Sequence, residues 1–220
     1  FFRALDEINP AGLLVGNPGT MKIAKELTCL PIQTDFSFNL FNHRAARFLR
    51  EQRTALATVS LELSFPQLRS LAERSPLPLE IIVHGATESM ICDHNLPSLA
   101  LGYAHPLDDP AFGDRRFALR DEVGGKHALR LDQYGRIHIL FTKDLCLYPY
   151  LPMLNGFASY RIEAQDYGSE LTGRLTRLYR EALNALTGNA SALDFEALAI
   201  LEKDSPRALS SGVYRFRLSQ

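Results

Sequence analysis

The chain has 220 residues, of which 46% are apolar and 22% charged, and its formal net charge is −1. This length suits one domain of good size, and the charge provides no overall field that would attract nucleic acid or an anionic membrane. The longest apolar runs are strand-sized, and the three cysteines are odd in number and scattered. These features argue against a membrane-spanning protein and a secreted disulfide scaffold, so we expect a cytoplasmic protein.

Strand-like and helix-like segments alternate along most of the chain. Strands are predicted at residues 12–16, 31–36, 57–63, 79–84 and 157–164. Helices are predicted at residues 21–27 and 41–52, after the capping box of Ser64 and Gln67, and around residues 171–182. Strands separated by helices of about ten residues indicate βαβ units and a parallel sheet. The second helix is expected to bury Phe41, Ala45, Phe48 and Leu49.

Residues 94–145 interrupt this alternation. Their first part, residues 94–125, carries prolines, glycines and charges without periodicity. Residues 127–141 then alternate around the turn Asp132–Gly135, which predicts a β-hairpin. We therefore expect a single α/β domain over residues 1–220, with residues 94–145 as an irregular and hairpin insertion.

Polar side chains occur near the ends of several predicted strands. They are Asp35, Asn39, Glu62, His84, Arg161 and Glu163. The carboxyl ends of parallel strands meet at one edge of a sheet or barrel, so these side chains are expected to converge on one site. A carboxylate inside an apolar strand needs a partner, and Arg161 is the natural one for Glu62.

Each candidate also has a structural explanation. Asp35 and Asn39 can cap the helix that follows them. Arg161 can form a structural ion pair with Glu62 or Glu163, and His84 can be a hydrogen-bonded residue at a strand end rather than a general base. Soft metal ligands are present at Cys92, His94, His105 and Cys146, but their spacing matches no compact zinc module.

Four stretches of the chain, in order, carry a resemblance to a known family. They are residues 31–42, Leu61–Ser64 with its Glu-Leu-Ser sequence, residues 79–86 followed by Met90 and Cys92, and residues 160–164. The ending at residues 211–215 is similar as well. Together they resemble the collagenase-like proteases of peptidase family U32. The family has a (β/α) barrel, and this chain corresponds to its later strands. We therefore expect a partial, TIM-like (β/α) barrel whose N-terminal half is missing or comes from a partner chain. This agrees with the opening at Phe1, which reads as the interior of a helix.

The resemblance implies a peptidase acting at the carboxyl edge of the barrel. Its expected catalytic residues are Glu62, His84, Arg161 and Glu163, and its expected substrate-binding residues are Asp35, Asn39 and Asn42. Other members support the hydroxylation of RNA bases or of a quinone precursor, using an iron–sulfur cluster held by four cysteines. Cys92 and Cys146 match the first and last ligands, but the two between them are missing, which leaves a degenerate cluster or metal site as the expectation. A non-catalytic partner subunit is the remaining alternative.

Overall fold

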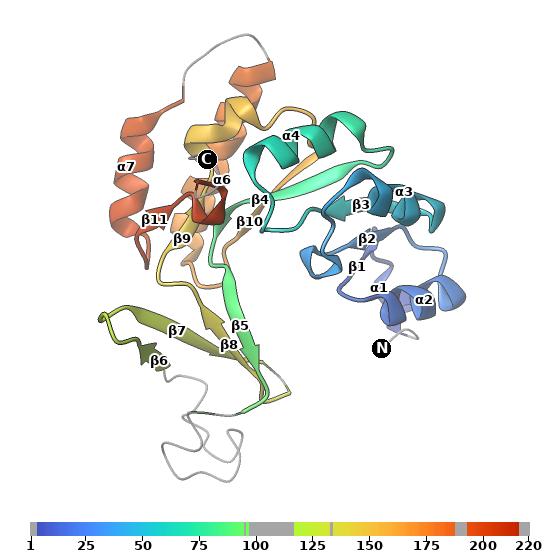
Figure 1. Ribbon diagram of the computed structural model, residues 1–220, viewed down its shortest axis with the longest axis horizontal. Coiled ribbons are helices and arrows are strands. Elements are labelled where there is room, and N and C mark those ends of the chain that lie inside the picture. Colours follow the sequence, from blue (N-terminus) through green and yellow to red (C-terminus); the bar gives the residue numbers. More distant parts are fainter. Residues whose placement is uncertain (1–3, 95, 97–116, 133, 188–192, 216–220) are drawn as a thin grey trace.

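A computed structural model describes residues 4–94, 96, 117–132, 134–187 and 193–215. The described chain contains a seven-stranded sheet that is mainly parallel and a four-stranded antiparallel sheet (Figure 1). The helices are α1 (Leu5–Ile8), α2 (Pro18–Leu27), α3 (His43–Glu51), α4 (Phe65–Arg74), α6 (Ser169–Thr187) and α7 (Phe195–Asp204). The predicted α/β class is therefore confirmed.

Parallel strands form the main part of the large sheet. They are β1 (Leu13–Val15), β2 (Ile32–Thr34), β3 (Thr54–Thr58), β4 (Leu79–Gly85) and β10 (Ser159–Glu163). Each pairs in parallel with the next, and Glu80 of β4 lies between Thr58 of β3 and Ser159 of β10. This confirms the predicted set of adjacent parallel strands, although β3 begins and ends earlier than predicted. Within the described residues the strands do not close into a barrel.

Two short strands extend the sheet from the carboxyl end of β4. Strand β9 (Asp144–Cys146) runs antiparallel to it and places Cys146 opposite His84, and β11 (Leu209–Ser210) pairs in parallel with β9. The Arg207 guanidinium lies 2.5 Å from the fully buried Asp144 carboxylate, so an ion pair holds this added part of the sheet. Because β10 and β9 both pair with β4, its last residues are enclosed rather than exposed at an open edge.

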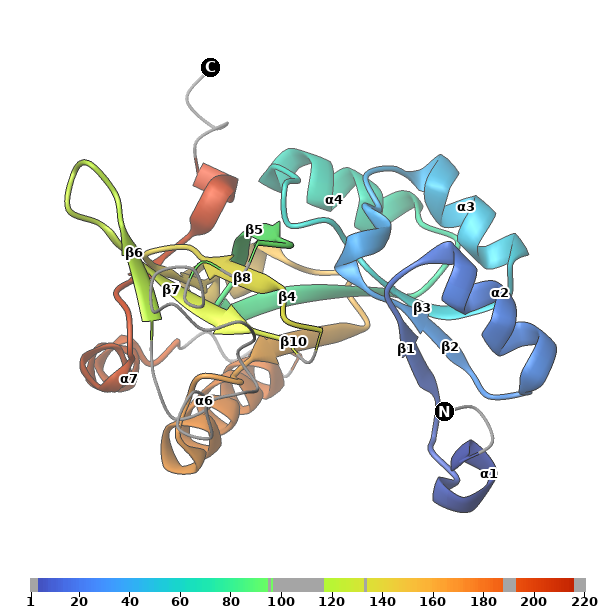
Figure 2. The same ribbon diagram turned by 90° about the horizontal axis from the view of Figure 1, so that it is seen from below.

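Two groups of helices pack against different parts of the large sheet. Figure 2 shows α2, α3 and α4 along one side of β1–β4 and α6 beside β10. Helix α4 begins at the predicted capping box, in which Gln67 Oε1 accepts a hydrogen bond from the Ser64 backbone N–H at 2.8 Å. Helix α3 buries the predicted Leu49 and partly buries the predicted Ala45, but its second buried residue is Ala46, which was not predicted.

The aromatic residues assigned to the buried side of the second helix are exposed. Phe48 is 55% exposed and Phe41 is 36% exposed. The helix begins at His43, after Asn42, whose side chain accepts hydrogen bonds from the backbone N–H groups of the first turn. Phe41 therefore precedes the helix, and the small side chain of Ala46 takes the position that contacts the core.

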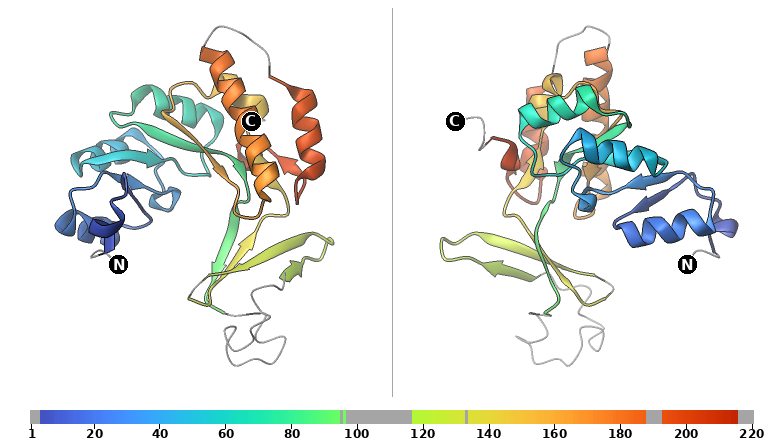
Figure 3. Two further views of the ribbon diagram at one scale, coloured as in Figure 1. Left: turned by 180° about the vertical axis from the view of Figure 1, so that it is seen from behind. Right: turned by 45° about the vertical axis from the view of Figure 1, so that its right-hand side comes forward.

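The antiparallel sheet extends away from the carboxyl end of β4 (Figure 3). Its strands, in spatial order, are β5 (Glu88–Cys92), β8 (Ile137–Leu140), β7 (Lys126–Leu131) and β6 (Phe117–Arg120). Strands β7 and β8 form the hairpin predicted at residues 127–141, with Leu129 opposite Ile139. The sequence did not predict β5 or β6, and most of the expected irregular excursion, residues 97–116, lies outside the described residues.

The core lies between the large sheet and its helices. It includes Ile81 and Val83 of β4, Leu68 and Leu71 of α4, and the Leu175, Leu178 and Ala182 stripe of α6 that the periodicity predicted. A smaller cluster around Val15 and Met21 joins β1 to α2. None of the helices in the described ranges is long and apolar enough to span a membrane.

Candidate functional site

Polar side chains from four neighbouring strands meet on one face of the large sheet, around Glu80. The Glu80 carboxylate accepts hydrogen bonds from Gln33 of β2 at 2.8 Å, Thr58 of β3 at 2.9 Å and Ser159 of β10 at 2.7 Å. Glu80 is only 5% exposed, and a carboxylate removed from water needs such donors to remain charged. The cluster therefore joins the parallel strands through one buried acidic group.

Arg161 of β10 extends this cluster to three carboxylates. Its guanidinium lies 2.7 Å from Asp35, 3.3 Å from Glu80 and 2.7 Å from Glu163. The contact from Nε to Glu163 lacks hydrogen-bond geometry, so it is an ion pair alone. Of the six residues expected to converge, the structure thus brings together three: Asp35 after β2, and Arg161 and Glu163, which both belong to β10. Glu80 was missed as a member, although a single carboxylate inside an apolar run was a visible signal.

His84 lies elsewhere, in the core beside α6. It is 1% exposed, and its Nδ1 lies 3.2 Å from the Tyr179 hydroxyl oxygen. Because that hydroxyl donates to the Val83 carbonyl at 3.0 Å, Nδ1 carries the ring proton and Nε2 is left without a partner among the described residues. Burial lowers the pKa of His84 to about 4. The structure therefore places a neutral, packed histidine here and does not bring it to the Arg161 cluster.

Glu62 is also not where the sequence placed it. Strand β3 ends at Thr58, and Glu62 lies exposed in the turn that follows, where its backbone N–H donates to Ser60 Oγ at 3.3 Å. The ion pairs of Arg161 go to three other carboxylates. The expected buried pair of Glu62 with Arg161 or His84 is therefore wrong, because the chain leaves the strand four residues before Glu62.

Glu62 and Asn39 both line a cavity of about 500 Å³. Its wall comes from the segments after β2 and β3, the β4–β5 connection, the residues before β9 and the C-terminal segment. Its volume lies in the range of small-ligand sites. Polar groups on the wall include Asn39, Glu62, Glu88 and Lys143, and apolar groups include Phe36, Leu61, Phe141 and Tyr214. The predicted site therefore divides between this cavity and the Arg161 cluster.

The remaining expected substrate-binding residues have local structural roles as well. The Asn42 side chain caps α3, and Asp35 accepts a hydrogen bond from the Phe36 backbone N–H at 2.8 Å in addition to its contact with Arg161. Asn39 adopts a left-handed backbone conformation with φ 51° and ends the short 3-10 helix η2 (Phe36–Phe38). Contrary to the expectation, Asn39 therefore does not cap the helix that follows it, because Asn42 does; Asn39 lines the cavity, where a ligand role remains open to it.

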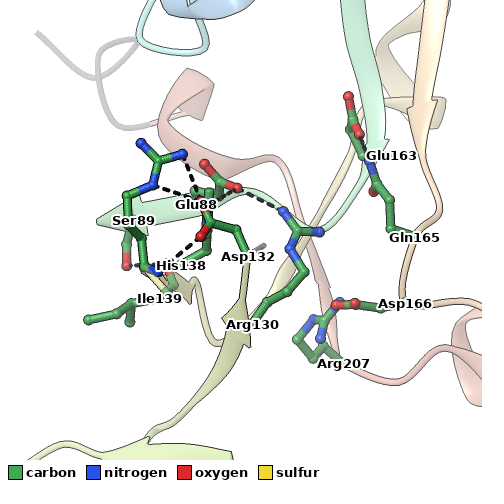
Figure 4. Close-up of polar contacts among 11 residues, drawn as sticks. Glu88, Ser89, Arg130, Asp132, His138, Ile139, Glu163, Gln165, Asp166 and Arg207 are labelled. Carbon is green, nitrogen blue, oxygen red and sulfur yellow. Dashed lines mark hydrogen bonds and ion pairs between the residues drawn. The ribbon is translucent and has the colours of Figure 1, made fainter. Parts of the chain in front are cut away.

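A second polar cluster, which the sequence did not predict, lies beside the cavity on the antiparallel sheet. Glu88 accepts hydrogen bonds from Arg130 at 2.7 Å and from His138 Nδ1 at 2.6 Å (Figure 4). The other ring nitrogen of His138 lies 3.4 Å from Asp132, which also binds Arg136. The carboxylate of Glu88 is thus engaged by two cationic or donor groups on the side of β7 and β8.

The cysteines expected to bind a metal are not grouped together. Cys146 is buried in β9, where burial raises the pKa of its thiol, whereas Cys92 is at the end of β5 in the other sheet. The part of the chain that the structure describes holds no group of three or more His, Cys, Asp or Glu residues able to bind a metal ion. The described residues therefore do not fit an iron–sulfur cluster, which needs four ligands. His105 lies outside them.

Comparisons with known proteins agree on the family. The family model described as Peptidase family U32 matches residues 1–219. An uncharacterized protease of Methanocaldococcus jannaschii is 27% identical over 194 residues, which cover 83% of this chain and 46% of the relative. The chain thus spans about half the length of this relative. No solved structure matches it. Since the family model covers nearly every residue, the chain belongs to peptidase family U32.

Proposed function

We propose that the chain carries the substrate-binding and catalytic part of a peptidase whose site is the 500 Å³ cavity at the carboxyl edge of the large sheet. We also propose that its parallel strands are a section of a (β/α) barrel, which further strands complete at β1 and β10. Support comes from the family membership, the order of the parallel strands and the position of the cavity at their carboxyl ends.

The observation that carries the proposal is the exposed Glu62 carboxylate at the cavity wall. Among the described residues it has no ion pair, unlike Glu88, whose carboxylate binds Arg130 and His138. A free carboxylate can accept a proton from water that attacks a peptide carbonyl. The Asn39 amide and the Lys143 ammonium, on the same wall, are groups that can stabilise the resulting oxyanion.

The test is cleavage of an unbiased peptide mixture by the purified protein, with new termini identified by mass spectrometry. Glu62→Gln keeps the shape of the side chain and removes its charge, so cleavage should fall by about 100-fold or more, the typical contribution of a general base. Because Glu62 is exposed, the variant should unfold at the same denaturant concentration as the parent. Glu51→Gln, on the exposed side of α3, is the matched control and should retain full activity. Cleavage that survives Glu62→Gln would contradict the assignment.

A non-catalytic partner subunit is the second candidate, and one observation favours it. Arg161 forms ion pairs with Asp35 and Glu163, so three residues expected at the site are engaged within one cluster. Groups saturated by mutual ion pairs are typical of a structural cluster. If the parent protein cleaves none of the peptides but still binds them, this second function is favoured.

A further inference from the structure

Strand β5 has an outer edge with which no described strand pairs. In the antiparallel sheet β5 is terminal, and it pairs only with β8 on its inner side. An unpaired edge presents a row of backbone N–H and C=O groups that can bind another extended chain. Five residues of strand are about 16 Å long, which is enough to pair with a short peptide.

The side chains of β5 leave this edge accessible. Met90 is 59% exposed and Ile91 is 52% exposed, and neither carries the charge that usually protects an edge strand. The single charged residue of the strand, Glu88, is turned toward Arg130 and His138 of the neighbouring strands, as Figure 4 shows. The register shift against β8 lies next to Ser89, at the end of the strand nearest β4.

The same end of β5 forms part of the cavity wall. Thr87, Glu88 and Ser89 line the cavity, so a strand added along β5 would lead directly into it. The cavity wall also includes aromatic and aliphatic side chains, among them Leu61 and Phe141, whose backbone N–H donates to the Thr87 carbonyl at 3.0 Å. One apolar side chain of an added strand would therefore find an apolar environment at this position.

The charge of the cavity indicates which kind of peptide could bind along β5. The charged groups of the cavity are Glu62, Glu88 and Lys143, and Glu88 already forms an ion pair with Arg130 and a hydrogen bond with His138. The remaining two have opposite signs, so the cavity has no net charge that would favour a nucleic acid or a strongly charged peptide. An uncharged segment with an apolar side chain matches this balance.

We propose that the outer edge of β5 binds an extended, uncharged peptide segment as an added strand, with one apolar side chain in the neighbouring cavity. This specifies how the proposed peptidase holds its substrate, and in that sense it rests on the proposed function. Binding and cleavage are nevertheless separate measurements. A peptide that binds as described but is not cut would overturn the peptidase assignment alone.

The experiment uses fluorescein-labelled seven-residue peptides in which threonine and valine alternate around a central phenylalanine, leucine or tyrosine. Binding is measured by fluorescence anisotropy. Each peptide is compared with two N-methylated forms, one blocked at the odd and one at the even backbone nitrogens. An edge strand uses the N–H groups of alternate residues, so one pattern should weaken binding about tenfold or more and the other should leave it within about twofold. No saturable binding of any parent peptide, or equal effects of both patterns, would overturn the proposal.

Protein variants provide the second readout. Phe141 is 44% exposed and lines the cavity, so Phe141→Ala should weaken binding of the phenylalanine peptide about fivefold or more without unfolding the protein. Phe48→Ala is the matched control, because Phe48 is similarly exposed but lies on α3, outside the cavity wall. Circular dichroism confirms that both variants fold. Equal affinities for the two variants would show that the peptide does not reach the cavity.

Discussion

Replacing Arg161 by methionine tests whether the ion-pair cluster is structural. The change keeps a long side chain on β10 but removes the charge that three carboxylates share. Arg161 is 17% exposed and Glu80 7% exposed at the side chain, so these two groups are poorly hydrated. The variant leaves Asp35, Glu80 and Glu163 close together without a cation.

The size of the effect follows from what each carboxylate retains. Removing one partner of a buried ion pair typically costs about 3–5 kcal/mol. Glu80 keeps its three hydrogen bonds from Gln33, Thr58 and Ser159, and Asp35 and Glu163 are partly hydrated at 24% and 17% exposure. The retained hydrogen bonds and the partial hydration reduce the cost of leaving the carboxylates without a cation. We therefore expect the free energy of unfolding to fall by about 2–3 kcal/mol, less than the loss typical of a fully buried ion pair.

Urea denaturation followed by circular dichroism measures this change as a lower midpoint with an unchanged slope. Arg69→Met is the matched control, because Arg69 forms an exposed pair with Glu73 one turn along α4 and should lose less than about 0.5 kcal/mol. Equal losses in the two variants would refute the reasoning, since they would mean that solvent screens the Arg161 cluster. If the proposed peptidase activity is found in the parent protein, a stable Arg161→Met variant that lacks it would instead give Arg161 a role at the reaction site.

Two further predictions concern β4. Burial lowers the pKa of His84 to about 4, so between pH 6.5 and 4 the unfolded chain binds a proton that the folded chain excludes. The contribution of this residue to the free energy of unfolding should therefore be fully present above pH 6.5 and decrease by about 3 kcal/mol as the pH falls to 4. Denaturation of the parent and of His84→Gln across this range checks it, and a parallel decrease in both would be evidence against the buried neutral ring. Gly85 has φ 115°, and an added Cβ would lie 1.9 Å from a carbonyl oxygen of β10, so Gly85→Ala should lower the melting temperature strongly. Gly168→Ala is the control and should leave the melting temperature nearly unchanged, because an added Cβ there meets open space.

The sequence could predict the elements that carry strong local signals. Helix α4 follows a capping box, and β4 is an apolar, β-branched run between prolines and a glycine. Strand β9 gave no such signal, because three residues are too few to show a period and one of them is the buried Asp144. Its partner Arg207 is 63 residues away in the chain, so only the tertiary structure pairs them.

The candidate site was predictable where strand ends were predicted correctly. Asp35, Arg161 and Glu163 come together because β2 and β10 end close to the predicted positions. Glu62 was assigned to the wrong environment because four residues separate it from the true end of β3, and a strand assigned too long turns an exposed turn residue into a buried one. Glu62 reaches the cavity because the chain turns after β3, and the local sequence did not indicate that turn.

His84 shows a limit of the rule that alternate residues share a face. On the pattern of β4 alone, Glu80 and His84 are four residues apart and should point the same way. The register of β4 against β10 shifts, however: Arg161 lies opposite Ile82, and Ile162 lies opposite His84. One extra residue in β4 therefore exchanges the two faces, as a β-bulge does. Glu80 stays with Arg161, whereas His84 turns toward Tyr179 of α6. The pairing with a strand almost eighty residues later decides which polar side chain reaches the cluster, and a single strand's sequence cannot show it.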